Sequence, residues 1–187
     1  RKLSPWFSER RNSSVNEIKR QLEYREENRG RVEAFHITRT LGSGTKLLLD
    51  EDAGLFMVTS AKNIAEANPD VLALSDVTGC TLDVEESSKE LLHEDKDGNE
   101  VSYNPPRYEY SYDFYIIVNV NNPYFNEMRF RINPNSVEIS PPPSIRPGVT
   151  LRFNPETNAE YKKYKQLGEE IRQILVKVRD DAREKIE

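Results

Sequence analysis

The stretch Arg107–Val120 reads R-Y-E-Y-S-Y-D-F-Y-I-I-V-N-V, and it decides the fold class. Every second position from Tyr108 to Val120 is aromatic or aliphatic, whereas alternate positions such as Glu109 and Asp113 are mostly polar. Side chains alternate between the two faces of a β-strand, so this spacing predicts one long strand with an apolar face. Most strands stop at about 5–6 residues, so a strand of this length is expected to be bent or shared between two sheets.

Shorter strand patterns lie on both sides of this stretch. Turn residues such as Gly42-Ser43-Gly44 and Asp95-Lys96-Asp97-Gly98-Asn99 separate them, which is typical of antiparallel hairpins. The further strands are expected at Val32–Leu41, Lys46–Leu49, Leu55–Thr59, Val77–Glu86, Met128–Ile132 and Val137–Ile139.

A helix is expected on each side of the β region. Ser14-Val15-Asn16-Glu17 has the spacing of a capping box, and it predicts a helix from Val15 to Glu27 that ends before Gly30. Asn154-Pro155 predicts the start of a second helix over Glu156–Lys185. This helix has an apolar stripe at spacings of three and four residues. The stripe consists of Tyr161, Tyr164, Leu167, Ile171, Ile174, Leu175, Val178 and Ala182.

These patterns divide the chain into four parts. They are an N-terminal arm and helix over residues 1–31, an antiparallel β domain over 32–140, a proline-rich linker over 141–154 and a C-terminal helix over 155–187. Within the arm, the apolar run Leu3–Phe7 is expected to dock on the domain. The expected fold class is mainly β (α+β): an antiparallel split barrel or sandwich of about six or seven strands, with an N-terminal helix and a long C-terminal helix.

Composition excludes several classes of protein. The net charge of −5 argues against a general nucleic-acid binder, because such proteins gain affinity by neutralising phosphates. The single cysteine, Cys80, rules out an internal disulfide and predicts a reducing, cytoplasmic compartment. The sequence contains neither an apolar run of about 18 residues nor a secretory signal. Because residue 1 is arginine, a trimmed chain with a missing upstream segment is expected.

The motifs that resemble catalytic or ligand sites fail on their spacing. Asp95–Gly98 lacks the acidic residues that a calcium loop needs at its first and twelfth positions, and Gly42–Lys46 lacks the glycine spacing of a phosphate loop. Cys80, His36 and His93 are too few for a structural zinc site, which takes four ligands. Cys80 is expected to be buried and His36 to be exposed. We expect no cofactor, no metal and no catalytic residue.

The C-terminal helix is the first candidate for an interaction surface. About thirty residues at 1.5 Å each make a rod of roughly 45 Å, which is longer than a small sandwich. Either the first half caps the sheet and the rest frays, or the distal half pairs with a second copy or another protein. The residues predicted to make that contact are Ile171, Ile174, Leu175, Val178 and Ala182.

Two resemblances add to these observations. The order of strands followed by a helix resembles the pleckstrin-homology-like fold, in which a C-terminal helix plugs one end of a split barrel. The segments Leu3–Phe7, Leu41–Lys46 and Asn104–Phe114 resemble an uncharacterised family of mainly Gram-positive bacteria. Members of that family carry an N-terminal four-cysteine zinc module, whose cysteines are absent here. The resemblance implies no activity.

The sequence therefore predicts a non-enzymatic interaction module that binds protein, or itself, through the C-terminal helix or a sheet edge. One alternative is a peripheral binder of anionic membranes. It would use the basic residues Lys2, Arg10, Arg11, Lys19 and Arg20. A second alternative is an enzyme with an unrecognised site around His36 or His93.

Overall fold

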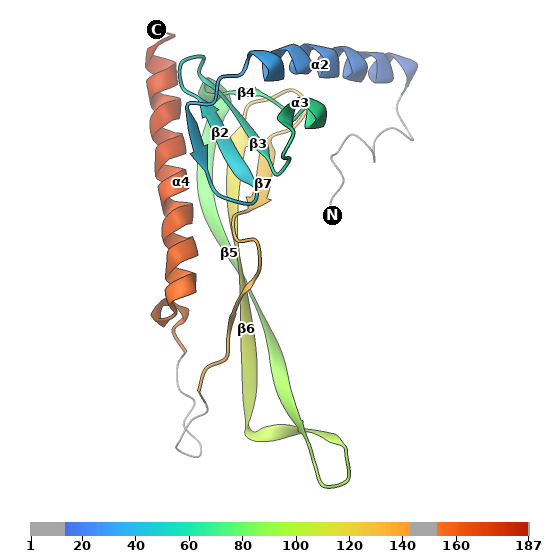
Figure 1. Ribbon diagram of the computed structural model, residues 1–187, viewed down its shortest axis with the longest axis vertical. Coiled ribbons are helices and arrows are strands. Elements are labelled where there is room, and N and C mark those ends of the chain that lie inside the picture. The colour runs from blue at the N-terminus through green and yellow to red at the C-terminus, as the bar shows by residue number, and fades with distance from the viewer. Residues whose placement is uncertain (1–13, 143–152, 187) are drawn as a thin grey trace.

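The computed structural model describes residues 14–142 and 153–186, and it has the expected α+β architecture (Figure 1). A helix α2 (Val15–Ala34) precedes two antiparallel sheets of four strands each, and a long helix α4 (Ala159–Glu184) follows them. The strands of the described residues form two separate sheets that do not close into a barrel. The apolar run Leu3–Phe7 and residues 143–152 of the predicted linker lie outside the described residues.

Helix α2 begins at the predicted capping box but ends later than predicted. The Ser14 hydroxyl accepts the backbone N–H of Glu17, and the Glu17 carboxylate accepts the backbone N–H of Ser14. The helix continues through Gly30 to Ala34, so the predicted end before Gly30 and the predicted strand start at Val32 were wrong. Val32 is buried under the first sheet, and this packing outweighs the roughly 1 kcal/mol that a glycine costs inside a helix.

The first sheet has both of its faces covered, with strand order β1-β2-β3-β4. Leu49 and Phe56 belong to the main core, whereas Leu48 and Met57 pack in a smaller core with Val32 of α2. Strand β2 contains three consecutive leucines, Leu47–Leu49, because both of its faces are buried. The short helix α3 (Ile64–Ala67) packs at the smaller core. The strands are β1 (Arg39–Leu41), β2 (Lys46–Asp50), β3 (Leu55–Thr59) and β4 (Leu72–Ala73).

The second sheet is built on the predicted long strand, which is β6 (Glu100–Val120). Its predicted parity is confirmed, because the side chains from Tyr112 to Val120 at every second position are at most 4% exposed. Its partner β5 (Val77–Glu94) continues eight residues beyond the predicted end at Glu86. The strands β7 (Glu127–Arg131) and β8 (Val137–Ile139) both pair with β6.

Helix α4 starts one turn later than predicted. Asn154 accepts the backbone N–H of Glu156 and begins a short 3-10 turn, η2 (Pro155–Thr157). Asn158 then caps α4 by accepting the backbone N–H of Tyr161. The polar side chains at both asparagine positions satisfy N–H groups that lack a partner within the helix.

Helix α4 runs lengthwise against the second sheet (Figure 1). Gly168 allows a close approach, because a Cβ atom there would lie 2.5 Å from Cδ1 of Leu82 on β5. Near its C-terminus, the guanidinium of Arg183 donates to the backbone oxygens of Ser75 and Val77 at 3.1 and 2.8 Å. The helix is thus fixed to the start of β5 as well as to the middle of the sheet.

Candidate interaction surface

The predicted partner-binding residues lie on the face of α4 that packs against its own chain. Ile171, Leu175, Val178 and Ala182 are at most 8% exposed, and Ile174 is half-buried beside them. The prediction assumed a sheet shorter than the helix. Instead, the distal half of the helix packs on the body, where the stripe shares one core with Leu49 and Phe56 of the first sheet and Arg183 binds the start of β5. This apolar stripe therefore forms part of the core.

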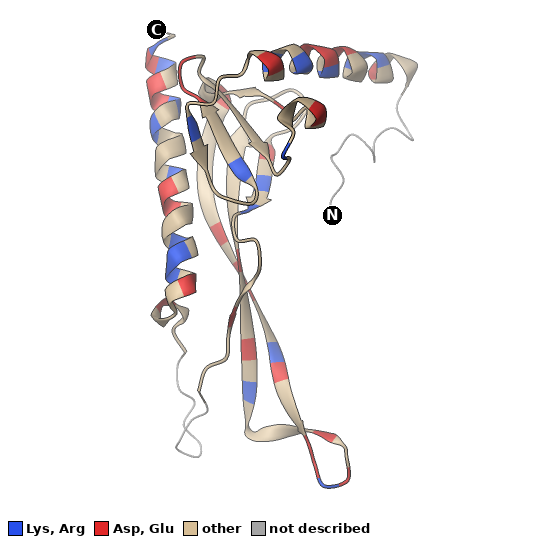
Figure 2. Cartoon of the chain, viewed as in Figure 1, with Lys and Arg blue, Asp and Glu red and all other residues tan. Residues whose placement is uncertain are grey.

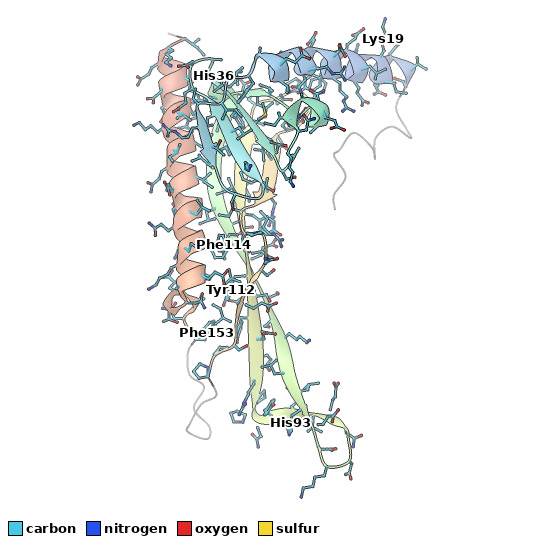
Figure 3. All side chains as sticks on the ribbon, viewed as in Figure 1. Lys19, His36, His93, Tyr112, Phe114 and Phe153 are labelled. Atoms are coloured by element: carbon cyan, nitrogen blue, oxygen red, sulfur yellow. The ribbon has the colours of Figure 1, made fainter. Side chains whose placement is uncertain are left out.

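An aromatic cluster closes the core near the start of α4 (Figure 3). The rings of Tyr112 and Phe114 meet the ring of Tyr161 with centroids 4.9 and 5.1 Å apart. Tyr110 stacks on Phe153 at 5.2 Å. The Tyr112 hydroxyl is buried, and burial together with the facing Glu86 carboxylate raises its pKa. These tyrosines belong to the apolar face predicted for the long strand, and here they pack against other aromatic rings.

Beyond this cluster, β5 and β6 leave the body as a two-stranded ribbon that we call the β-arm, residues 87–108 (Figure 1). Strand β8 pairs with β6 only at residues 110–112, and β7 pairs only from Tyr115 onward. Within the β-arm, the two strands pair with each other and with no other described strand. Both outer edges consequently present backbone groups for which the described residues supply no ladder partner.

A bulge interrupts the β-arm and defines its elbow. Strand β6 inserts four residues, Tyr103–Pro106, between its pairings with Leu91 and Leu92. The guanidinium of Arg107 lies 4.2 Å from the Tyr103 ring centroid, and the His93 ring lies 4.5 Å from the same ring. Such bulges bend a strand and increase its twist, and here they set the direction of the outer half of the ribbon.

The β-arm and its root are acidic (Figure 2). Residues 85–109 contain eight carboxylates and three basic side chains. Glu94 and Glu100 lie directly opposite each other, an unfavourable arrangement for like charges. At the tip, the Asp95 carboxylate accepts the backbone N–H groups of Asp97 and Asn99, and these hydrogen bonds lower the pKa of Asp95. The predicted hairpin turn is therefore confirmed.

The two faces of the ribbon differ in how their acidic groups are neutralised. On one face, the Arg129 guanidinium contacts the carboxylates of Asp83 and Glu85 at 3.1 and 2.6 Å. The acidic side chains on the other face of β5 make no ion pair with a described residue. These are Glu86, Glu90 and Glu94.

The basic residues predicted to contact an anionic membrane divide between α2 and the segment before it. Lys19 and Arg20 are exposed on α2, where acidic and basic side chains are interspersed (Figure 2). Lys19 lies 4.0 Å from Glu23 on the next turn. Among the described residues, no helix has the length and apolarity that a membrane crossing requires. Lys2, Arg10 and Arg11 lie outside the described residues.

The two histidines lie at opposite ends of the molecule and do not share a site (Figure 3). His36 is exposed before β1, with Nδ1 4.0 Å from a carboxylate oxygen of Asp52, and His93 lies at the elbow. Cys80 is buried as predicted, and burial raises the pKa of its thiol to about 11. Residues 14–142 and 153–186 contain no group of three or more His, Cys, Asp or Glu that could hold a metal ion.

The β-arm is the surface that sequence reasoning missed. The sequence predicts the hairpin turn at Asp95–Asn99, but it predicts that the preceding strand ends at Glu86. A turn of this kind joins two strands that reach it, so its position already implied that residues 87–94 pair with residues after Asn99.

Comparison of the chain with protein-family models, with curated proteins and with solved structures found no match. The resemblance to a bacterial family with an N-terminal zinc module therefore stays a prediction.

Proposed function

We propose that the chain is a non-enzymatic protein-binding module and that the β-arm is the element that contacts its partner. The observation that carries this proposal is the pairing of the ribbon. From residue 87 to residue 108 its strands have no other described strand beside them, so both edges are free for an additional strand. Addition of an extended segment to a free sheet edge is a common mode of protein recognition.

The energetics of the β-arm support the same proposal. A two-stranded hairpin is marginally stable in water, because it buries little apolar surface. Leu92 and Tyr108 are 45% and 41% exposed on this ribbon. A partner that covers these side chains would supply the burial that the chain itself does not provide.

The proposal includes a reducing, cytoplasmic setting and no cofactor. The reducing setting is supported by the single cysteine, Cys80, which is a free, buried thiol.

The test is photo-crosslinking in cells of the source organism. A photoreactive amino acid is placed at Leu92 of the β-arm or, as a matched control, at Lys177 on the exposed face of α4. We expect a discrete protein adduct from position 92 and none from position 177. The adduct should disappear on competition with an untagged intact chain.

A shortened variant provides the second arm of this test. Residues 90–108 are replaced by Asn-Gly, which joins the facing residues Lys89 and Glu109 through a tight turn. The variant should fail to compete for the adduct. Full competition by the shortened chain, or equal crosslinking from positions 92 and 177, would contradict the proposal.

A further inference from the structure

We infer that the β-arm binds along the outer edge of β5, from Glu86 to Glu94, and that the occupant is an extended basic segment of another protein that adds as a third strand. This inference rests on the proposed function and specifies which edge is used and what chemistry the partner has.

The two edges of the β-arm are not equivalent. On β6, four residues leave the ladder at the elbow, and two of them, Pro105 and Pro106, lack a backbone N–H. Proline and bulges are the features that protect an edge against strand addition. The stretch Ser87–Glu94 of β5 contains no proline and no glycine, and each of its residues pairs with β6. The edge of β5 is therefore the continuous one.

The charges along β5 specify a basic occupant. Glu86, Glu90 and Glu94 share one parity of the strand at intervals of four residues, without an ion pair to a described residue. Residues directly opposite in neighbouring antiparallel strands share a face, and opposite charges there are stabilising. An added strand with Lys or Arg at every fourth position would place each cation against one of these carboxylates.

A second copy of β5 brings no cation opposite the three glutamates of this edge. Two copies of β5 would pair antiparallel about a two-fold axis. An axis at Ser88 places Glu86 opposite Glu90, and an axis at Glu90 places two glutamates opposite each other. In every such register residues of one parity face each other, so Lys89 never lies opposite Glu86, Glu90 or Glu94 and cannot neutralise them. Like charges opposite each other are destabilising, so charge complementarity favours a different, basic protein.

The inference is tested with the full chain and a synthetic peptide, acetyl-Lys-Thr-Val-Thr-Lys-Thr-Val-Thr-Lys-amide. Its lysines match the four-residue interval, and its valines fall opposite Ser88 and Leu92. The control peptide has the same composition with its three lysines adjacent. For the binding measurement each peptide carries a fluorophore in place of its acetyl group and its fluorescence anisotropy is followed, and backbone amide exchange is measured along β5 and β6.

We expect the matched peptide to saturate below about 1 mM and to bind about tenfold more tightly than the control peptide. Alternate amides of β5 between Glu86 and Glu94 should exchange more slowly when it is bound, because an added strand bonds every second residue on its side. The exchange rates of the Tyr103 and Asn104 amides at the elbow of β6 should not change.

Charge variants separate the edge from general attraction. The pair Glu86→Gln with Glu90→Gln removes two of the facing carboxylates and should weaken binding about tenfold. The matched pair Asp83→Asn with Glu85→Gln removes two carboxylates from the other face, which Arg129 already neutralises, and should change binding less than about twofold.

Three outcomes would overturn the inference. They are no saturation by the matched peptide, equal binding of both peptides without alternate amide protection, and a doubled mass of the chain alone with the same β5 protection. The first two leave the crosslink from position 92 intact, because it reports on any protein that contacts the β-arm, whereas a dimer would turn it into an adduct of two copies of the chain. Loss of that crosslink would instead end the proposed function, whatever the peptides do.

Discussion

At the scale of single residues, the Asn133 side chain bonds backbone groups of β6 that have no partner in a neighbouring described strand. It follows β7, is 1% exposed, and accepts the backbone N–H of Phe114 at 2.8 Å. Its amide donates to the backbone oxygens of Tyr112 and Asn135 at 3.2 and 2.9 Å. One side chain thus pairs backbone groups of β6 where β7 has ended and β8 has not begun, which is where an unpaired group would be costly.

Replacing Asn133 by alanine should lower the free energy of unfolding by about 2–3 kcal/mol, because the Phe114 N–H would remain buried without a partner. The exposed Asn135 offers a control, since Asn135→Ala retains the backbone oxygen and should change stability by less than about 0.5 kcal/mol. Urea denaturation of both variants measures the difference. Equal stability of the two variants would show that the amide network contributes nothing.

Gly168→Ala should destabilise the chain, although alanine is the better helix former by about 1 kcal/mol. The added Cβ would meet Leu82 at 2.5 Å from Cδ1 and 3.2 Å from Cγ, so the leucine must move. Gly30 is the control, because a Cβ there meets nothing within 4 Å and Gly30→Ala should stabilise by about 0.5–1 kcal/mol.

A double-mutant cycle completes this prediction. In a chain that carries Leu82→Ala, the clash is absent, and Gly168→Ala should cease to destabilise, with a coupling of about 1 kcal/mol or more. Additive effects in thermal or urea denaturation would mean that the helix does not approach β5 at this point.

The stability of the chain should fall between pH 10 and pH 12 in part because of Tyr24. Burial and the neighbouring Asp70 carboxylate raise the pKa of Tyr24 from 10.0 to about 12, and its hydroxyl donates to Asp70. The folded state then holds this proton more tightly than the unfolded state. Its contribution is complete below pH 10 and is lost as the pH rises through 12.

Tyr24→Phe should therefore make the alkaline decline shallower, as measured by urea denaturation at steps between pH 9 and pH 12. The decline should not vanish, because burial also raises the pKa values of Tyr112 and Tyr161. Tyr124→Phe retains the ring that contacts Tyr24 at 4.7 Å and should preserve the slope. A slope in Tyr24→Phe equal to that of the parent chain would contradict this assignment.

At the scale of elements, β6 is one strand in two environments. Its second half pairs with β5 and β7 and packs under α4, whereas its first half pairs with β5 alone among the described strands. The side chains from Tyr112 onward alternate between buried and half-buried, and those before Glu109 are half-buried or exposed. Folding of the body should thus be largely independent of the β-arm.

The shortened chain, with residues 90–108 replaced by Asn-Gly, should keep the free energy of unfolding of the intact chain within about 1 kcal/mol. The denaturant dependence should decrease slightly, because less surface becomes exposed on unfolding. A loss of more than about 2 kcal/mol would show that the β-arm packs on the body, and the ribbon would then be structural rather than a contact element.

The elements that sequence predicted well are those whose apolar residues all serve the core. The alternation from Tyr112 to Val120 and the stripe of α4 each reflect burial on one face, and both were found where predicted. Residues 87–94 lack such alternation, because backbone pairing and not burial holds them in β5. Residues Val32–Leu41 alternate by coincidence, since Val32 faces the smaller core from a helix.

The candidate site was predicted less well for the same reason. Helical periodicity identified Ile171, Leu175 and Val178 as apolar residues of one face but not what covers that face. The first sheet, the turn before β5 and the inner halves of β5 and β6 cover that face, and this arrangement depends on contacts between segments far apart in the sequence. A free edge leaves no apolar pattern in the sequence.

At the scale of the whole molecule, α4 and α2 cover different parts of the body. Helix α4 packs on the second sheet and contributes to the main core, and α2 contributes Val32 to the smaller core on the opposite face of the first sheet. Asn28, which is 2% exposed, ties α2 to the loop before β4 by donating to the backbone oxygen of Pro69 and accepting the N–H of Val71.

Leu175→Ala should lower the free energy of unfolding by about 2–5 kcal/mol, because Leu175 is fully buried between α4 and the sheets. Lys177→Ala, two residues along the same helix and exposed, should change it by less than about 0.5 kcal/mol. Removal of residues 170–187 should abolish cooperative unfolding altogether. A cooperative transition in that truncated chain would mean that the end of α4 is dispensable for folding.

Within the described residues, the β-arm is attached to the body at its root, so a small rotation there moves the distant turn. Eight residues of strand from Ser87 to Glu94 extend it by roughly 25 Å. A bend of about five degrees where it leaves the aromatic cluster displaces the Asp95 turn by roughly 2 Å. A force applied at the tip would act on the body first at the root of the β-arm, where Tyr110 packs on Phe153 and Tyr112 packs on Tyr161.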